Sequence, residues 1–194
     1  MAFSNKSLLV VLAVFVLSHL GCEALQAQLP GSVISEFPVP DISAEDVWAL
    51  YSSPELPTLI VQLMPSLYKS IDVMLGNGTE GTILKITLQP TNSGPLTWHE
   101  RFVKVDHKTR TKVVRQMNGG FLNMGFTLYE DIFEIKSTGP NSCVIRATVN
   151  FIVLEESRSG ASIITADWSM AYAMVDYIRR YNANNYLASK TDSQ

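Results

Sequence analysis

Apolar and polar residues alternate most regularly in the middle of the chain, between residues 97 and 135. Because the side chains of a strand point to opposite faces with a period of two, this pattern predicts strands. Polar or glycine-containing stretches at residues 106–110 and 118–120 interrupt the alternation and predict turns. We therefore expect three consecutive antiparallel strands, over residues 97–105, 111–117 and 126–135.

The flanking segments predict further strands and three helices. A short helix is expected after Asp41 or Ser43, either of which can cap it, and a second one over residues 55–63. A long helix is expected over about residues 162–186, where apolar residues recur at spacings of three and four. Further strands are expected over residues 36–39, 67–75, 83–88 and 143–154.

This order of elements indicates an α+β fold. One strand, two short helices, six strands and one amphipathic helix predict a seven-stranded antiparallel sheet with one buried face. A curved sheet packed on a helix tends to leave a cavity between them that binds small apolar ligands. Residues 41–187 are expected to form this domain after a lead-in segment, residues 25–40, and before a disordered tail, residues 188–194.

The N-terminal segment has the pattern of a secretory signal peptide. Lys6 precedes an unbroken apolar run, residues 8–17, and small residues stand before an expected cleavage site at Ala24. A membrane anchor is the alternative, but the run is too short to span a bilayer comfortably. A signal peptide predicts that the chain enters the secretory pathway and reaches the vacuole or the cell exterior. After cleavage of residues 1–24, no membrane association is expected.

Charge and composition exclude several classes of site. A formal net charge of −3 and the absence of a basic stripe argue against nucleic-acid binding. Cys143 is the one cysteine after the signal peptide, so no internal disulfide is expected, and it is interpreted as a buried small residue rather than a catalytic thiol. His99 and His107 are too few and too poorly placed for a metal site. No cofactor is expected, and the protein is expected to be a monomer or a homodimer.

A glycine-rich loop at residues 76–82 (GNGTEGT) lies between two predicted strands. Glycines permit positive φ and a close approach of the backbone, so the loop forms either a tight hairpin or a cradle for an anion. Asn77-Gly78-Thr79 is also a glycosylation sequon, which predicts a glycan on Asn77 in a secreted chain.

Three charged residues fall on the apolar faces of the central strands. A charge in that place is costly unless it is paired or used. By spacing alone, an exposed ion pair between Glu100 and Lys112 is the favoured interpretation, and a bulge can turn Asp131 to the other face. The predicted faces comprise Trp98, Glu100 and Phe102, then Lys112, Val114 and Gln116, then Tyr129, Asp131 and Phe133.

The element order, the loop GNGTEGTI and the string NGGFLNMGFTLYED resemble the Bet v 1 / pathogenesis-related-10 family, and within it the norcoclaurine synthases of plants. The resemblance covers about residues 41–181. It implies a seven-stranded sheet around a long C-terminal helix with a ligand tunnel. It also implies a Pictet–Spengler condensation of dopamine with 4-hydroxyphenylacetaldehyde that needs no cofactor.

The resemblance assigns roles to individual residues and favours a tunnel site over an exposed ion pair. Lys112, Glu100 and Asp131 match the family's catalytic lysine, glutamate and aspartate, and Trp98 stands where the family has a tyrosine. Tyr129, Phe102 and Val114 are implied to line the substrate site. Two other functions stay open: a carrier of a small hydrophobic plant metabolite without turnover, and an isomerase or lyase acting on a preformed alkaloid.

Overall fold

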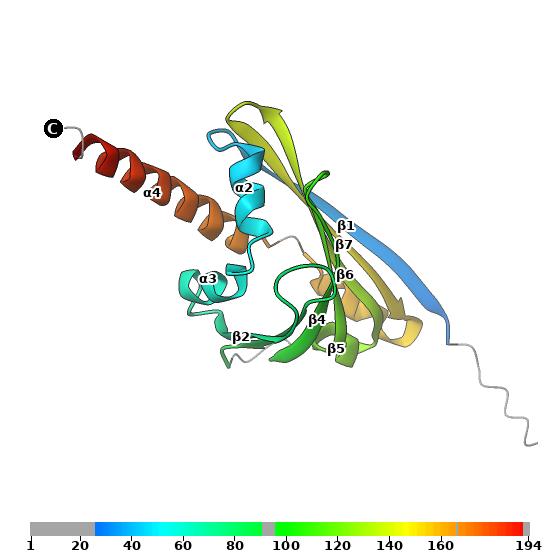
Figure 1. The fold of residues 1–194 in the computed structure, drawn as a ribbon. Helices are drawn as coiled ribbons and strands as arrows, with labels where there is room; N and C mark the ends of the chain where they lie inside the picture. The colour runs from blue at the N-terminus through cyan, green and yellow to red at the C-terminus, as the bar shows by residue number, and fades with distance from the viewer. Residues whose placement is uncertain (1–25, 91–95, 166, 192–194) are drawn as a thin grey trace, which may run out of the picture.

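The computed structural model describes residues 26–90, 96–165 and 167–191, and the predicted signal peptide lies outside these ranges. A seven-stranded antiparallel sheet with the order β1-β7-β6-β5-β4-β3-β2 forms the body of the fold, and helices α2, α3 and α4 lie on one side of it (Figure 1). The α+β class and the number of strands are confirmed. The strands are β1 (Gln28–Val39), β2 (Tyr68–Leu75), β3 (Ile83–Leu88), β4 (Thr97–Asp106), β5 (Thr111–Gly119), β6 (Phe126–Gly139) and β7 (Ser142–Leu154).

The helices follow the predicted order. α2 begins after Ser43, whose hydroxyl oxygen accepts a hydrogen bond of 3.1 Å from the backbone N–H of Asp46. Such a cap satisfies one of the free amide groups in the first turn of a helix. Two short 3₁₀ helices lie in connections: η1 joins β5 to β6, and η2 comes after β7. The bounds are α2 (Ala44–Tyr51), α3 (Leu56–Leu63), η1 (Gly120–Met124), η2 (Glu155–Ile163) and α4 (Ser169–Thr191).

The strand expected over residues 36–39 is longer than predicted, because β1 (Gln28–Val39) takes up most of the predicted lead-in segment. β1 pairs with β7 along its whole length, from Gln28 opposite Leu154 to Val39 opposite Cys143. β1 is the edge strand of the sheet. Prolines are tolerated on an edge strand, where one side of the backbone needs no partner, and Pro30 therefore obscures this strand in the sequence pattern.

The C-terminal helix is shifted from its predicted place. α4 begins at Ser169, not near residue 162, because residues 155–163 form the 3₁₀ helix η2. The carboxylate of Asp167 accepts a hydrogen bond of 2.8 Å from the backbone N–H of Ser169 and so marks the start of α4. α4 continues to Thr191, past the predicted end of the domain at residue 187, and its C-terminal part projects beyond the other elements (Figure 1).

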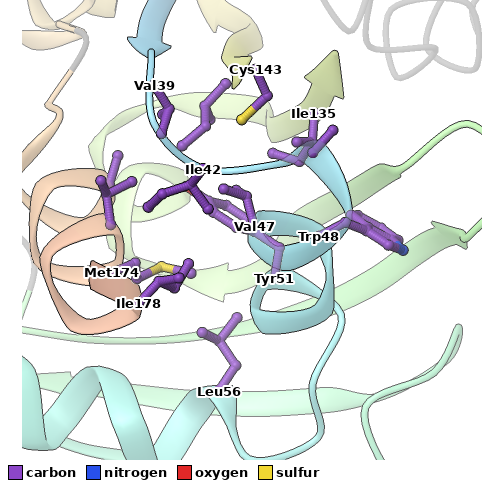
Figure 2. Packing of buried hydrophobic residues seen from close by; sticks show 14 of the residues in the cluster. Val39, Ile42, Val47, Trp48, Tyr51, Leu56, Ile135, Cys143, Met174 and Ile178 are labelled. Atoms are coloured by element: carbon purple, nitrogen blue, oxygen red, sulfur yellow. The ribbon is translucent and has the colours of Figure 1, made fainter. Parts of the chain in front are cut away.

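The main core lies where α2 meets α4 and the sheet (Figure 2). Tyr51 and Val47 from α2 pack there with Met174 from α4, and all three are at most 2% exposed. Cys143 belongs to the same cluster and is buried, as expected. No helix in the described part of the chain is long and apolar enough to cross a membrane.

Candidate active site

An apolar cavity of about 170 Å³ lies between the sheet and the short helices. Three ionisable side chains from three adjacent strands reach it: Glu100 from β4, Lys112 from β5 and Asp131 from β6. The structure thus brings the three predicted charged residues to one place. The remaining lining residues are Tyr51, Leu56, Pro57, Ile60, Tyr68, Ile71, Leu84, Ile86, Trp98, Phe102, Val114, Phe133 and Met170.

Lys112 is buried, with 3% of its surface exposed. Its ammonium Nζ donates a hydrogen bond of 3.1 Å to the backbone carbonyl oxygen of Tyr51, the last residue of α2, and lies 3.7 Å from the centre of the Phe102 ring. Burial lowers the pKa of Lys112 to about 8, against the opposite effect of the Glu100 carboxylate. The interpretation of Lys112 as half of an exposed ion pair is therefore wrong.

Two weak contacts hold this ammonium. The C-terminal end of a helix carries partial negative charge on its free carbonyl groups, and the face of an aromatic ring is negative as well. The Tyr51 carbonyl and the Phe102 ring supply these two groups at Lys112. Neither is a full charge, so the lysine can lose its proton near neutral pH.

Glu100 is linked to Trp98 on the same face of β4. The indole Nε1 of Trp98 donates a hydrogen bond of 3.0 Å to Oε2 of Glu100. Burial raises the pKa of Glu100, while the Trp98 hydrogen bond and the charge of Lys112 act against this rise. A carboxyl group in this setting is a stronger base than an exposed one.

Asp131 faces the same cavity, which settles the question of register. β5 and β6 pair without a bulge over the relevant residues, with Val114 opposite Asp131 and Lys112 opposite Phe133. Burial raises the pKa of Asp131 to about 7, and the nearby carboxylates of Glu100 and Glu130 act in the same direction. Two carboxyl groups and one amine therefore line one poorly solvated cavity, a setting in which the pKa values of ionisable groups are shifted.

A second cavity of about 230 Å³ lies next to the first. The two cavities have four lining residues in common, Tyr68, Asp131, Phe133 and Met170. Tyr129 lines this second cavity, whereas Trp98, Phe102 and Val114 line the first. Asp131 is thus the charged residue that stands at the boundary between the two spaces.

Some residues of the site escaped the sequence analysis. Tyr51 was predicted only to lie on the apolar side of a helix. Its carbonyl oxygen can accept the hydrogen bond from Lys112 because α2 ends at this residue. Tyr68 stands at the start of β2 and reaches both cavities. Burial, followed by the charges of Glu100, Asp167 and Asp131, raises the pKa of Tyr68 to about 12.

The other reactive residue types lie away from this site. His99 bonds to Asn118 through Nδ1 at 2.7 Å, and Nδ1 of His107 accepts a hydrogen bond from Trp48 at 3.2 Å. Burial raises the pKa of the Cys143 thiol to about 11, which disfavours the reactive thiolate. Among the described residues, no group of three His, Cys, Asp or Glu side chains is arranged to hold a metal ion.

Comparison with known proteins shows close similarity to plant synthases. The chain is 39% identical over 140 residues to S-norcoclaurine synthase 1 of Papaver somniferum, which covers 70% of this chain and 60% of the relative. It is 37% identical to norbelladine synthase of Narcissus pseudonarcissus, which covers 72% of this chain and 85% of the relative. The chain therefore spans about 60% of the length of the poppy relative.

The fold is also that of a solved relative. The structure of norcoclaurine synthase from Thalictrum flavum in complex with dopamine and hydroxybenzaldehyde aligns with a TM-score of 0.75 and 29% identity. The alignment covers 82% of this chain and 94% of that one. No protein-family model matches the sequence.

Proposed function

The chain belongs to the Bet v 1 / pathogenesis-related-10 family, in the group that contains the norcoclaurine and norbelladine synthases, and from this premise we propose that it joins an arylethylamine to an aryl aldehyde by a Pictet–Spengler condensation. The convergence of Lys112, Glu100 and Asp131 on one apolar cavity is the observation that carries the proposal. An amine of the dopamine type is the expected partner of the aldehyde.

The reaction requires protons to be moved in a fixed order. The amine adds to the aldehyde carbon, water leaves to give an iminium ion, the aromatic ring attacks that carbon, and a ring proton departs. A proton donor is needed for the leaving oxygen and a base for the ring proton. Holding two reactants together in a site with little water supplies a large part of such catalysis.

Lys112 suits the first of these tasks. With a pKa of about 8 it is partly protonated and partly neutral near neutral pH, so it can donate a proton to the departing oxygen and regain one afterwards. The Tyr51 carbonyl and the Phe102 ring keep its ammonium on the cavity side of β5. In this role its proton leaves with the water molecule.

Glu100 and Asp131 suit the remaining tasks. Glu100, whose pKa is raised by burial, removes the ring proton and restores aromaticity. Asp131 orients the amine of the substrate or the ammonium of Lys112 from the next strand. The two cavities that share Asp131 are the spaces in which we propose that the two reactants bind, one in each.

The test is incubation of the protein lacking residues 1–24 with dopamine and a panel of aryl aldehydes, followed by chiral analysis of the product. One enantiomer in excess, formed faster than without protein, is expected. A racemic product at the background rate would reject the proposal. Lys112→Met serves as the control variant, because it has a similar length and no charge.

A carrier function without turnover is the second candidate, and the Trp98–Glu100 hydrogen bond favours it. The bond occupies one oxygen of the carboxylate that the reaction needs as a base. A carrier would bind the amine or the aldehyde alone and would release both unreacted. Binding of either compound by the wild type in calorimetric titration, with no product above the background rate when both are present, would assign this function.

We further propose that the protein passes through the secretory pathway to the vacuole or the cell exterior. The apolar run after Lys6 supports this destination.

A further inference from the structure

The end of β2 exposes three consecutive apolar side chains. Val73, Met74 and Leu75 are 49%, 57% and 59% exposed. In the described part of the sheet, β2 is an edge strand that pairs only with β3. A shift of register between Val73 and Leu75 marks an irregularity at Met74. An exposed apolar end of an edge strand favours unwanted association with other chains unless it is blunted or covered.

The loop after this strand end is fixed in shape. Gly76 and Gly78 have φ values of +89° and +94°, which residues with a side chain rarely adopt. The backbone N–H of Gly78 donates a hydrogen bond of 3.0 Å to the hydroxyl of Thr82, and a Cβ atom on Gly78 would lie 2.9 Å from Cα of Pro54. The loop is therefore a tight hairpin packed on the segment between α2 and α3.

This packing leaves Asn77 exposed at the tip of the hairpin. The hydroxyl of Thr79 donates a hydrogen bond of 2.9 Å to Oδ1 of Asn77, so the amide nitrogen Nδ2 is not the atom engaged by Thr79. Asn77-Gly78-Thr79 is the one N-x-S/T sequence after residue 24. Nδ2 is the atom to which an N-linked oligosaccharide is attached.

We propose that Asn77 carries an N-linked oligosaccharide that covers the apolar end of β2. A polyprenyl-pyrophosphate-linked oligosaccharide is the donor: a bond forms between Nδ2 and the first sugar, the sugar–phosphate bond breaks, and the lipid pyrophosphate leaves as Nδ2 loses a proton. The glycan stays outside the folded protein because Asn77 is exposed in the native structure.

The position of the glycan suits the surface that it covers. Asn77 comes two positions after Leu75, so their Cα atoms lie at most about 7 Å apart. Met74 is one residue further, at most about 11 Å away. A bulky, strongly hydrated sugar chain at that distance hinders a second strand from pairing with the edge of β2.

The first experiment measures modification. Residues 25–194 are fused to an established signal peptide and expressed in a eukaryotic cell that secretes the protein. The result then depends neither on residues 1–24 nor on any enzymatic activity. A mass increase of one N-glycan, removed by peptide N-glycosidase, is expected. Asn77→Gln and Thr79→Ala should abolish it, and Thr79→Ser should retain it. Secreted wild-type protein of unmodified mass overturns the proposal.

The second experiment measures the covering of β2. Light scattering over a concentration series compares glycosylated wild type with Asn77→Gln, after circular dichroism has shown that both are folded. Asn77→Gln is expected to associate at lower concentration. Asn77→Gln combined with Met74→Lys should restore the wild-type behaviour, because a lysine blunts an exposed edge strand. If Asn77→Gln behaves as the wild type, or if Met74→Lys has no effect on its association, the glycan does not protect β2.

Discussion

Trp98 and Glu100, two residues apart on one face of β4, are joined by a hydrogen bond of 3.0 Å from the indole Nε1 to the carboxylate Oε2. Both side chains line the cavity between the sheet and the short helices. Burial raises the pKa of Glu100, and this bond acts against the rise. The proton affinity of the expected base is therefore set in part by Trp98, at the position where the family resemblance implies a tyrosine.

Replacement of Lys112 by methionine should remove most turnover and leave the fold intact. A positioned proton donor contributes about 10²–10⁴-fold to a rate, so a loss of that size is expected in kcat. Met has a similar length and removes a charge that burial disfavours. Stability should therefore change by less than about 1 kcal/mol, the net value of a single hydrogen bond. Thermal unfolding and steady-state rates check both expectations.

The opposite pattern would assign Lys112 to structure alone. If Lys112→Met unfolds at a much lower temperature while the rate persists, the Tyr51 carbonyl contact stabilises the junction of α2 with the sheet and the lysine takes no part in the reaction. Lys112→Ala should lose the same activity, with a greater loss of stability because it leaves a cavity beside Phe102.

The central strands could be predicted because alternation determines which side chains share a face of the sheet. Both bounds of β3 (Ile83–Leu88) agree with the sequence analysis. The residues predicted to share a face on β4, β5 and β6 line one or both of the two cavities, apart from Gln116. β1 was not recognised in full because prolines interrupt its pattern while its edge position tolerates them. The start of α4 was misplaced because η2 continues a helix-like pattern with a different hydrogen-bonding geometry.

The candidate site was predictable as a set of residue types but not as an arrangement. Spacing alone favoured an exposed ion pair between Glu100 and Lys112, and only the family resemblance placed both residues and Asp131 in one site. The pairing of β5 with β6 then places Asp131 on the side of Lys112. The groups that hold Lys112 are a backbone carbonyl and an aromatic face. A backbone carbonyl has no signature in the sequence, since every residue has one, and its availability depends on where the helix ends.

Asp131→Asn should change how stability depends on pH. The pKa of Asp131 is about 7 in the folded protein, above its ordinary value of 3.8, so between these pH values the folded state holds a proton that the unfolded chain has released. Stability therefore falls as pH rises from about 4 to about 7, by at most about 1.4 kcal/mol per pH unit for this one group. Asn cannot ionise and should remove this contribution.

Denaturant unfolding at pH 4 and at pH 8 measures the effect of Asp131→Asn. The variant should gain stability relative to the wild type at pH 8, where the wild type holds a buried charge, and the difference should shrink at pH 4. An equal difference at both pH values would mean that Asp131 titrates in the folded protein as it does in the unfolded chain.

The compartment of the protein should depend on residues 1–24. A fluorescent fusion of the full chain is expected in the secretory pathway, with the vacuole or the cell exterior as its destination, because Lys6 and the apolar run after it have the pattern of a signal peptide. The fusion that lacks these residues should be cytosolic. A cytosolic full-length fusion would show that the N-terminal segment is not a signal peptide.

Trp98→Tyr should raise the rate on a hydroxylated aldehyde. Tryptophan offers a flat apolar body and one N–H donor, and that donor is already bonded to Glu100. Tyrosine keeps a flat body, is smaller, and adds a hydroxyl that can both donate to and accept from the phenol of a substrate. One hydrogen bond of this kind contributes about 1 kcal/mol, which corresponds to roughly a fivefold change in rate.

The wild type should accordingly prefer smaller or less polar aldehydes, and the substitution should shift that preference. The measurement is kcat/KM of the wild type, Trp98→Tyr and Trp98→Phe with hydroxylated and unhydroxylated phenylacetaldehyde. Trp98→Phe controls for size and for the loss of the bond to Glu100, because it has the ring of tyrosine without the hydroxyl. A ratio of the two substrates that rises in Trp98→Tyr but not in Trp98→Phe identifies the hydroxyl as its cause. The same ratio in all three proteins would mean that Trp98 does not line the path of the aldehyde, and that its part in the site is confined to holding Glu100.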